Sequence, residues 1–143
     1  MEIKKVAIIG GGTMGSGIAE VCAKSGLDTI VMEPEAAAAE AAQNRIDSSL
    51  DKAVARGRLS QEDRSTTGAL LSYTTDINAL GDRDLVIEAI VENEAIKLEL
   101  FKRLDEVTPE HCILASNTSS IPLINIGTAT KRPDRVLGLH FFN

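Results

Sequence analysis

The sequence predicts an α/β fold, a mostly parallel β-sheet with helices on both faces. Two observations carry this prediction. Short, β-branched apolar runs alternate with helix-like stretches along the whole chain, as in consecutive β-α-β units. No internal repeat or linker interrupts the alternation, and 143 residues with 43% hydrophobic and 25% charged side chains suit one globular domain with its own core.

The chain is predicted to open with a strand, a tight turn and a helix. The run KKVAIIG (4–10) is short, β-branched and closed by glycines, which is typical of a buried strand. In the next stretch, 13–25, the apolar residues Met14, Ile18 and Cys22 are spaced four apart and share one helix face. We therefore expect a helix that packs one face on the sheet.

A second strand, a long helix and a short helix are expected next. DTIVME (28–33) is predicted to be a strand that ends on an acidic residue. The alanine-rich stretch 34–59 has Pro34 in a helix-opening position and Gly57 as a break, so we predict a helix. SQED (60–63) has a serine followed three residues later by an acid, a weak capping box that predicts another short helix.

The second half of the chain repeats the alternation. LLSYTT (70–75) and DLVIEAI (84–90) are expected to be strands, and the second of these is the stronger prediction. Apolar residues at helical spacing predict an amphipathic helix over 93–107. CILAS (112–116) and RVLGLH (135–140) are predicted to be further short strands.

Composition excludes several classes of function. A formal net charge of −6 and a pI near 4.9 argue against a general nucleic-acid surface. No apolar run approaches the roughly 18 residues of a membrane-spanning helix, and the N-terminal run breaks into glycines too early for a signal peptide. Cys22 and Cys112 have no metal-ligand spacing, so no metal site is predicted and both are expected to be buried thiols. We expect a cytoplasmic or matrix-type location.

The glycines after the first strand indicate a dinucleotide-binding turn. Gly10, Gly12 and Gly15 form a G-x-G-x-x-G pattern between a predicted strand and a predicted helix. The first glycine permits the tight turn, the second lets the backbone approach a pyrophosphate, and the third lets the helix pack against the strand. The pyrophosphate then meets free N–H groups at the helix N-terminus. The predicted fold is therefore a Rossmann-type, doubly wound sheet.

An acidic residue at the expected distance indicates which dinucleotide binds. Glu33 ends the second predicted strand, 18 residues beyond Gly15, where a carboxylate can accept both adenosine ribose hydroxyls. A 2′-phosphate would be repelled there, and the next residues are Pro34 and Glu35 rather than arginine. NAD is therefore favoured over NADP, the alternative being that Glu33 is a solvated strand end.

Four motifs in order resemble one enzyme family over all 143 residues. GGGTMGSGIA, VIEAIVENEAIKLELFKRLD, ASNTSSIPL and LGLHFFN are similar to motifs in the NAD-binding domain of the L-3-hydroxyacyl-CoA dehydrogenases, including the 3-hydroxybutyryl-CoA dehydrogenases. The resemblance implies an NAD-dependent, reversible oxidation of (S)-3-hydroxyacyl-CoA to 3-oxoacyl-CoA. It implies that His140 is the general base, that Ser119 hydrogen-bonds the same substrate oxygen, and that Asn143 helps align substrate and nicotinamide.

The glycine turn and the resemblance together define the remaining candidates. Residues matching Ser49 and Arg56 approach the coenzyme A moiety in the family, and Lys52 shares the helix face of Arg56. The candidate cofactor-binding residues are Gly10, Gly12, Thr13, Met14, Gly15, Glu33, Ala89, Glu92, Lys97 and Asn117.

Simpler interpretations remain open for several of these residues. His140 can be a packed or surface histidine, Ser119 and Ser120 can cap a following helix, and Lys52 with Arg56 can be a solvated helix face. Met14 also fits the apolar helix face described above.

In the family, a glutamate beyond HFFN orients the histidine, and a C-terminal helical domain closes the cleft and forms a homodimer. The resemblance places both after Asn143, so we expect residues 1–143 to fold and bind NAD with little turnover. The alternative functions are a stand-alone NAD-binding module and a structural, crystallin-like relative without catalysis.

Overall fold

The computed structural model describes residues 1–142 and shows a six-stranded sheet in which every strand pair is parallel. The spatial order of the strands is β3-β2-β1-β4-β5-β6. The strands are β1 (Lys5–Ile9), β2 (Asp28–Met32), β3 (Leu71–Thr74), β4 (Leu85–Glu88), β5 (Ile113–Ser116) and β6 (Val136–Gly138). This confirms the predicted Rossmann-type class.

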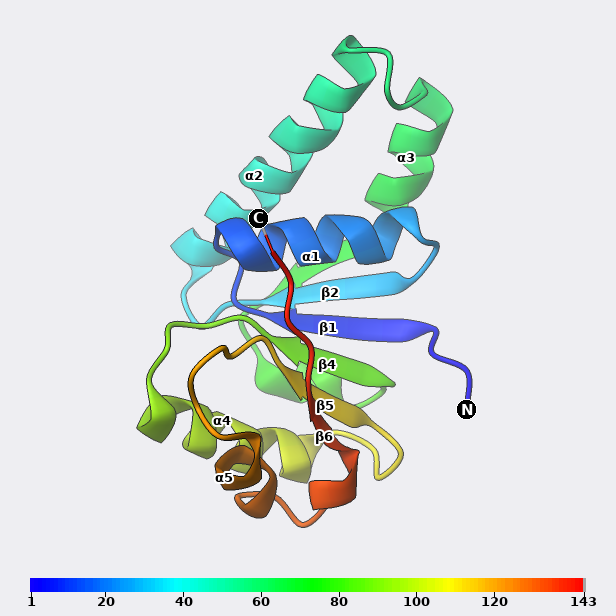
Figure 1. The fold of residues 1–143 in the computed structure, drawn as a ribbon. Coiled ribbons are helices and arrows are strands. Elements are labelled where there is room, and N and C mark those ends of the chain that lie inside the picture. The colour runs from blue at the N-terminus through cyan, green and yellow to red at the C-terminus, as the bar shows by residue number, and fades with distance from the viewer. Residues whose placement is uncertain (143) are drawn as a thin grey trace.

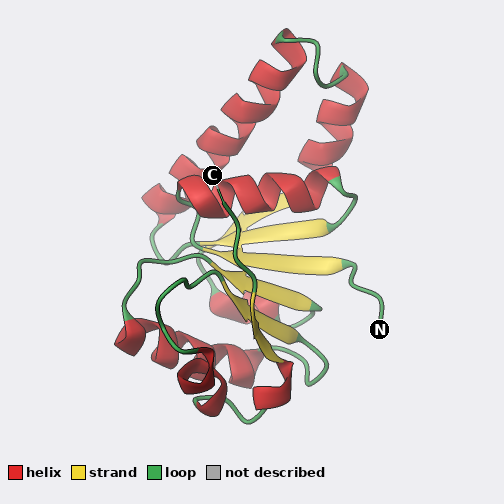
Figure 2. Cartoon of the chain, viewed as in Figure 1, coloured by secondary structure: helices red, strands yellow, loops and turns green. Residues whose placement is uncertain are grey.

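Helices cover both faces of the sheet, as predicted (Figures 1 and 2). One face carries α1, α2 and α3, of which α2 and α3 project beyond the sheet as a helical pair, and the other carries α4 and α5. The helices are α1 (Thr13–Lys24), α2 (Ala36–Ala55), α3 (Gln61–Ala69), α4 (Glu94–Val107) and α5 (Leu123–Thr128), with short 3-10 turns η1 (Ile77–Leu80) and η2 (Pro133–Arg135).

Alternation along the buried strands builds a core on each side of the sheet. In β1, Val6 and Ile8 belong to the cluster beneath α1 and α2, whereas Ala7 and Ile9 belong to the cluster beneath α4. All four side chains are at most 3% exposed. Because a central parallel strand is covered on both faces, it is apolar at every position, which is why KKVAIIG reads as a continuous run.

The element boundaries differ from the sequence predictions at three functional positions. β2 ends at Met32, so Glu33 lies just beyond the strand, although its N–H still donates to the Thr74 carbonyl at 3.0 Å. α2 begins at Ala36 rather than at Pro34, because Glu35, the residue before it, is extended. β6 ends at Gly138, so His140 follows the strand instead of ending it.

The strand order places a crevice between β1 and β4. The chain leaves β1 toward β2 and β3 on one side and later returns to β4 on the other, so the order reverses at this pair. Ligands of open α/β sheets bind outside the carboxyl ends of the strands at this reversal. Within residues 1–142, no helix combines the length and the apolar character needed to cross a bilayer.

Candidate functional site

The turn after β1 is shaped by two glycines. Gly10 has a φ of +97°, a conformation that favours glycine, and its N–H donates to the Met32 carbonyl at 3.0 Å. A Cβ on Gly15 would lie 1.7 Å from the Gly10 carbonyl oxygen, so only glycine lets α1 pack this closely on the turn. Both roles agree with those expected from the motif.

A cavity of about 490 Å³ opens at the carboxyl ends of β1, β2 and β4. Its walls are largely apolar, and Glu33 is the carboxylate among the lining residues: Ile9, Gly10, Gly12, Met32, Glu33, Pro34, Ala89, Ile90, Val91, Ile96 and Leu100. A Cβ on Gly12 would meet no protein atom within 4 Å, so the backbone there faces open space. An apolar slot with one acid and an open glycine turn fits the adenosine half of a dinucleotide.

The two residues that follow Gly12 lie on another side of the turn. Thr13 is exposed at the start of α1, and Met14 is half-buried against the core. Both line a second cavity of about 310 Å³ with Phe141 and Phe142, where the C-terminal segment crosses over α1 (Figure 1). They are thus placed on the side of the glycine turn that faces the segment containing His140.

A charge cluster lies at the carboxyl end of β4, with Glu88 and Lys97 buried and the side chain of Glu92 37% exposed. Glu88 is fully buried and Lys97 is 2% exposed, with 3.1 Å between Lys97 Nζ and Glu88 Oε2. Lys97 Nζ also donates to Glu92 Oε1 at 2.7 Å. The other Glu88 oxygen accepts from Ser116 Oγ at 2.6 Å, and the Ile90 N–H donates to Glu88 Oε2 at 2.7 Å. The ammonium of Lys97 is therefore held between two carboxylates beneath the surface.

Glu92 connects this cluster to the loop after β5. Its carboxylate accepts hydrogen bonds from Thr118 Oγ1 at 2.8 Å, the Ser119 N–H at 3.1 Å and Ser120 Oγ at 3.1 Å. The hydrogen bond from Lys97 is the main reason why the pKa of Glu92 falls to about 2. Glu92, Lys97 and Ser119, three predicted site residues, thus lie together at one end of the sheet.

These contacts correct one of the simpler interpretations. Ser119 and Ser120 do not cap α5, which begins at Leu123 after Pro122 without a side-chain cap. They bind Glu92 because the loop turns back toward α4 before the helix begins.

His140 and Ser119 follow adjacent strands. Ser116 pairs with Gly138 in the β5–β6 register, so Ser119 and His140 lie three and two residues beyond a paired position. Asn117 joins the two segments, because its Oδ1 accepts a hydrogen bond from the Phe141 N–H at 2.8 Å. The exposed His140 ring packs edge-on against Phe142 and makes no hydrogen bond within residues 1–142. Asn143, the third predicted catalytic residue, lies outside the described residues.

The residues predicted to approach coenzyme A share a cationic cavity. Ser49 and Arg56 line a space of about 250 Å³ together with Lys24, Lys52 and Arg58. Ser49 Oγ donates to Glu20 Oε1 at 2.8 Å. The site therefore contains four positively charged side chains and a serine hydroxyl that donates to the Glu20 carboxylate.

Sequence reasoning missed Glu88 and Ser116. Both lie inside runs interpreted as apolar strands, DLVIEAI and CILAS, and inside two of the family motifs, but neither residue was singled out. An acid within an otherwise apolar strand is the available signal, because a buried carboxylate almost always has a partner. The partner itself, Lys97 on another element, could not be read from the strand. Among the described residues, no group of three or more His, Cys, Asp or Glu could hold a metal ion.

The chain is similar to known proteins over its whole length. The family described as "3-hydroxyacyl-CoA dehydrogenase, NAD binding domain" matches residues 5–143. A 3-hydroxybutyryl-CoA dehydrogenase of Mycobacterium tuberculosis is 53% identical over 99% of this chain and 50% of its own length. The peroxisomal fatty acid beta-oxidation multifunctional protein MFP2 of Arabidopsis thaliana is 46% identical over 99% of this chain and 20% of its own.

The solved structures show the same relationship. The crystal structure of M. tuberculosis FadB2 superposes with a TM-score of 0.97 at 51% identity, covering 100% of this chain and 50% of that one. The chain thus spans about half the length of these dehydrogenases and a smaller share of the multifunctional protein.

Proposed function

The chain belongs to the NAD-binding domain family of the 3-hydroxyacyl-CoA dehydrogenases, and from this premise we propose that it serves the reversible oxidation of (S)-3-hydroxyacyl-CoA to 3-oxoacyl-CoA. The observation that carries the proposal is the position of Ser119 and His140 just beyond the carboxyl ends of the paired strands β5 and β6. Asn117 ties the two segments together beside the end of the sheet where the NAD crevice opens.

His140 and Ser119 would have separate roles in the proposed reaction. When bound, NAD accepts the hydride from C3 of the substrate. His140 accepts the proton of the 3-hydroxyl group and returns it in the reverse direction, since a histidine can act as base and acid near neutral pH. Ser119 donates a hydrogen bond to the same oxygen, and the loop that carries it is anchored by Glu92. The C3–H and O–H bonds break and the C=O bond forms, with the hydride going to NAD and the proton to His140.

The cationic cavity supports a coenzyme A thioester as substrate. Lys24, Lys52, Arg56 and Arg58 can neutralise phosphates, and an arginine offers a bidentate fork to each. The solvated helix face considered from the sequence is less favoured, because α1 and α2 bring these residues around one hollow rather than along one exposed stripe.

Turnover is expected to require more than the described residues supply. Within residues 1–142 the His140 ring contacts Phe142 but accepts or donates no hydrogen bond, so no polar partner among them fixes its tautomer. We expect the 143-residue chain to bind NADH but to oxidise it slowly with acetoacetyl-CoA. A chimera carrying the second half of the M. tuberculosis relative should be active, as followed by NADH absorbance.

In that chimera, His140→Gln should lower kcat by about a hundredfold or more, because proton transfer loses its base. His111→Gln, which changes an exposed histidine paired with Asp84, is the matched control. An undiminished rate in His140→Gln would refute the assigned base. Equal rates for the chimera and the 143-residue chain would refute the need for an orienting partner, and NADH binding without turnover in either would favour the stand-alone NAD-binding module.

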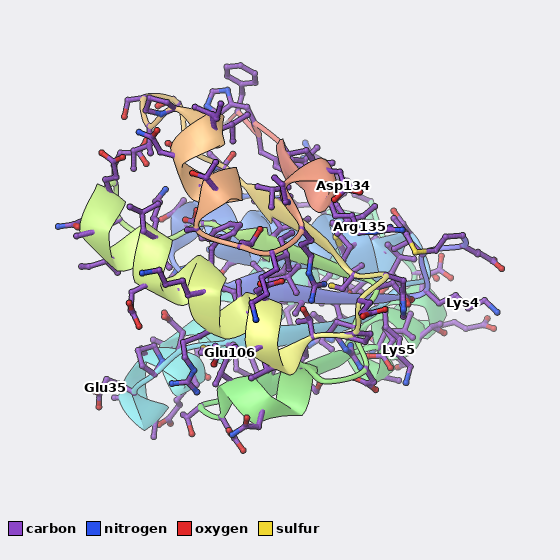
Figure 3. The ribbon with its side chains drawn as sticks, turned by 90° about the horizontal axis from the view of Figure 1, so that it is seen from below. Lys4, Lys5, Glu35, Glu106, Asp134 and Arg135 are labelled. Carbon is purple, nitrogen blue, oxygen red and sulfur yellow. The ribbon has the colours of Figure 1, made fainter. Side chains whose placement is uncertain are left out.

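Glu33 is expected to set the preference for NAD over NADP. In Glu33→Ala, NAD should bind roughly tenfold more weakly or worse, because charge-assisted hydrogen bonds to the ribose are lost. NADP binding should improve or stay constant, because repulsion of its 2′-phosphate is removed. Calorimetric dissociation constants for both nucleotides measure the effect. Glu106→Ala changes an exposed acid near the end of α4 (Figure 3), which does not line the crevice, and should leave the ratio unchanged.

A further inference from the structure

The charges around Lys97 do not balance. One ammonium contacts two carboxylates, at 3.1 Å from Glu88 and 2.7 Å from Glu92, so the three groups carry one surplus negative charge. The other nearby partners, Ser116, Thr118, Ser120 and backbone N–H groups, are neutral. The surplus therefore persists within the cluster.

The cluster lies at the functional end of the sheet. Glu88 is paired in register with Ile9 of β1 and with Ser116 of β5, and Ile9 and Ala89 line the crevice cavity. Glu92 reaches from the start of α4 to the loop that holds Ser119, the residue proposed to contact the reacting oxygen. The surplus charge thus lies at the end of the sheet that carries Ser119, where the nicotinamide would be held if Ser119 contacts the reacting oxygen.

We propose that the Glu88–Lys97–Glu92 cluster raises the affinity of this site for NAD⁺ relative to NADH, an inference that rests on the proposed function. The nicotinamide ring carries a positive charge in NAD⁺ and none in NADH. A fixed negative charge near the ring stabilises only the oxidised form. The interaction is strongest from the fully buried Glu88, because Glu92 is partly open to solvent and is screened. Because the oxidised form is stabilised, the bound cofactor would be a weaker oxidant, so the cluster favours hydride transfer from NADH to the 3-oxo group.

Lys97 is a positioning residue in this arrangement. Its 2% exposure leaves no room for direct access by a ligand, and its two ion pairs fix Glu92 against the 118–120 loop. Glu92 remains ionised through the neutral pH range because its pKa is lowered to about 2 by Lys97 and the loop donors. The preference should therefore be constant between about pH 5 and pH 8 as far as Glu92 determines it.

The test compares the dissociation constants of NAD⁺ and NADH in the 143-residue chain and three variants. NADH can be followed by its own fluorescence, since the protein has no tryptophan, and NAD⁺ by calorimetry. Glu92→Gln and Glu88→Gln each remove the surplus charge while keeping the side-chain shape. Glu106→Gln makes the same change in net charge on an exposed residue near the end of α4 (Figure 3) and serves as control.

We expect both cluster variants to lower the ratio Kd(NADH)/Kd(NAD⁺) by roughly three- to tenfold, and the control to leave it unchanged. The fully buried Glu88 cannot touch the cofactor, so its effect separates charge from contact. If Glu88→Gln does not fold, the ratio Kd(NADH)/Kd(NAD⁺) is compared between the wild type and Glu92→Gln at several salt concentrations. Because salt screens charges, the difference between the two ratios must shrink as salt is raised.

An unchanged ratio in both variants overturns the inference, as does a change in Glu92→Gln alone when Glu88→Gln folds. A difference that is insensitive to salt also overturns it. If both nucleotides still bind, any of these results leaves the proposed function intact. If the wild-type chain binds neither nucleotide, the proposed function and this inference are both refuted.

Discussion

Gly15→Ala is expected to prevent folding or to lower the free energy of unfolding by more than about 4 kcal/mol, an exceptional loss for one methyl group. The added Cβ would lie 1.7 Å from the carbonyl oxygen of Gly10 and 2.8 Å from its carbonyl carbon. Both are backbone atoms of a turn whose φ of +97° leaves little freedom to move, so α1 would have to lift from β1. Urea unfolding followed by circular dichroism measures the loss.

Gly17→Ala provides the control on the same helix. A Cβ there meets no atom within 4 Å, and alanine favours an exposed helical position by about 1 kcal/mol over glycine. This variant should be as stable as the wild type or more so. If Gly15→Ala were equally stable, the close packing of α1 on the glycine turn would be refuted.

Lys97→Met is expected to lower the free energy of unfolding by about 3–5 kcal/mol, because it leaves the carboxylate of Glu88 buried without its cation. Methionine matches the apolar stem of lysine, so lost packing accounts for little of the effect. Chemical unfolding at neutral pH is the measurement.

Two variants show whether the cost comes from the unpaired charge. Glu88→Gln combined with Lys97→Met removes both charges and should recover part of the lost stability. Lys102→Met changes an exposed lysine of α4 and should cost less than about 0.5 kcal/mol. Equal losses in Lys97→Met and Lys102→Met would contradict the buried ion pair.

Elements with strong local patterns could be predicted from the sequence. Continuous β-branched runs marked β1 and β4, and helical spacing marked α1 and α4 to within one or two residues. Boundaries were less predictable: 28–33 reads as one strand, yet the strand ends at Met32 because local propensity does not say where partner strands stop. That difference places Glu33 one residue beyond the strand, where its N–H still bonds β3 and the residue lines the crevice.

The candidate site was likewise only partly predictable from the sequence. Gly10, Gly12, Gly15 and Glu33 could be found because the turn and the next strand end lie close together in the chain. The resemblance singled out Glu92, Lys97 and Ser119, but neither it nor the residue pattern indicated how they are joined. Glu88 and Ser116 were missed, since each is an isolated polar residue in an apolar run.

The sequence by itself determined the fold class, the dinucleotide-binding turn and the family, because each can be recognised from short segments with a characteristic periodicity or residue spacing. Only the tertiary structure decided that Lys97 lies between Glu88 and Glu92, that Asn117 holds the segment after His140, and that Ser49 donates to Glu20. Those contacts join residues from separate elements. The first two exist only once β4, β5 and β6 are aligned in parallel with their carboxyl ends together, and the third only once α2 packs against α1.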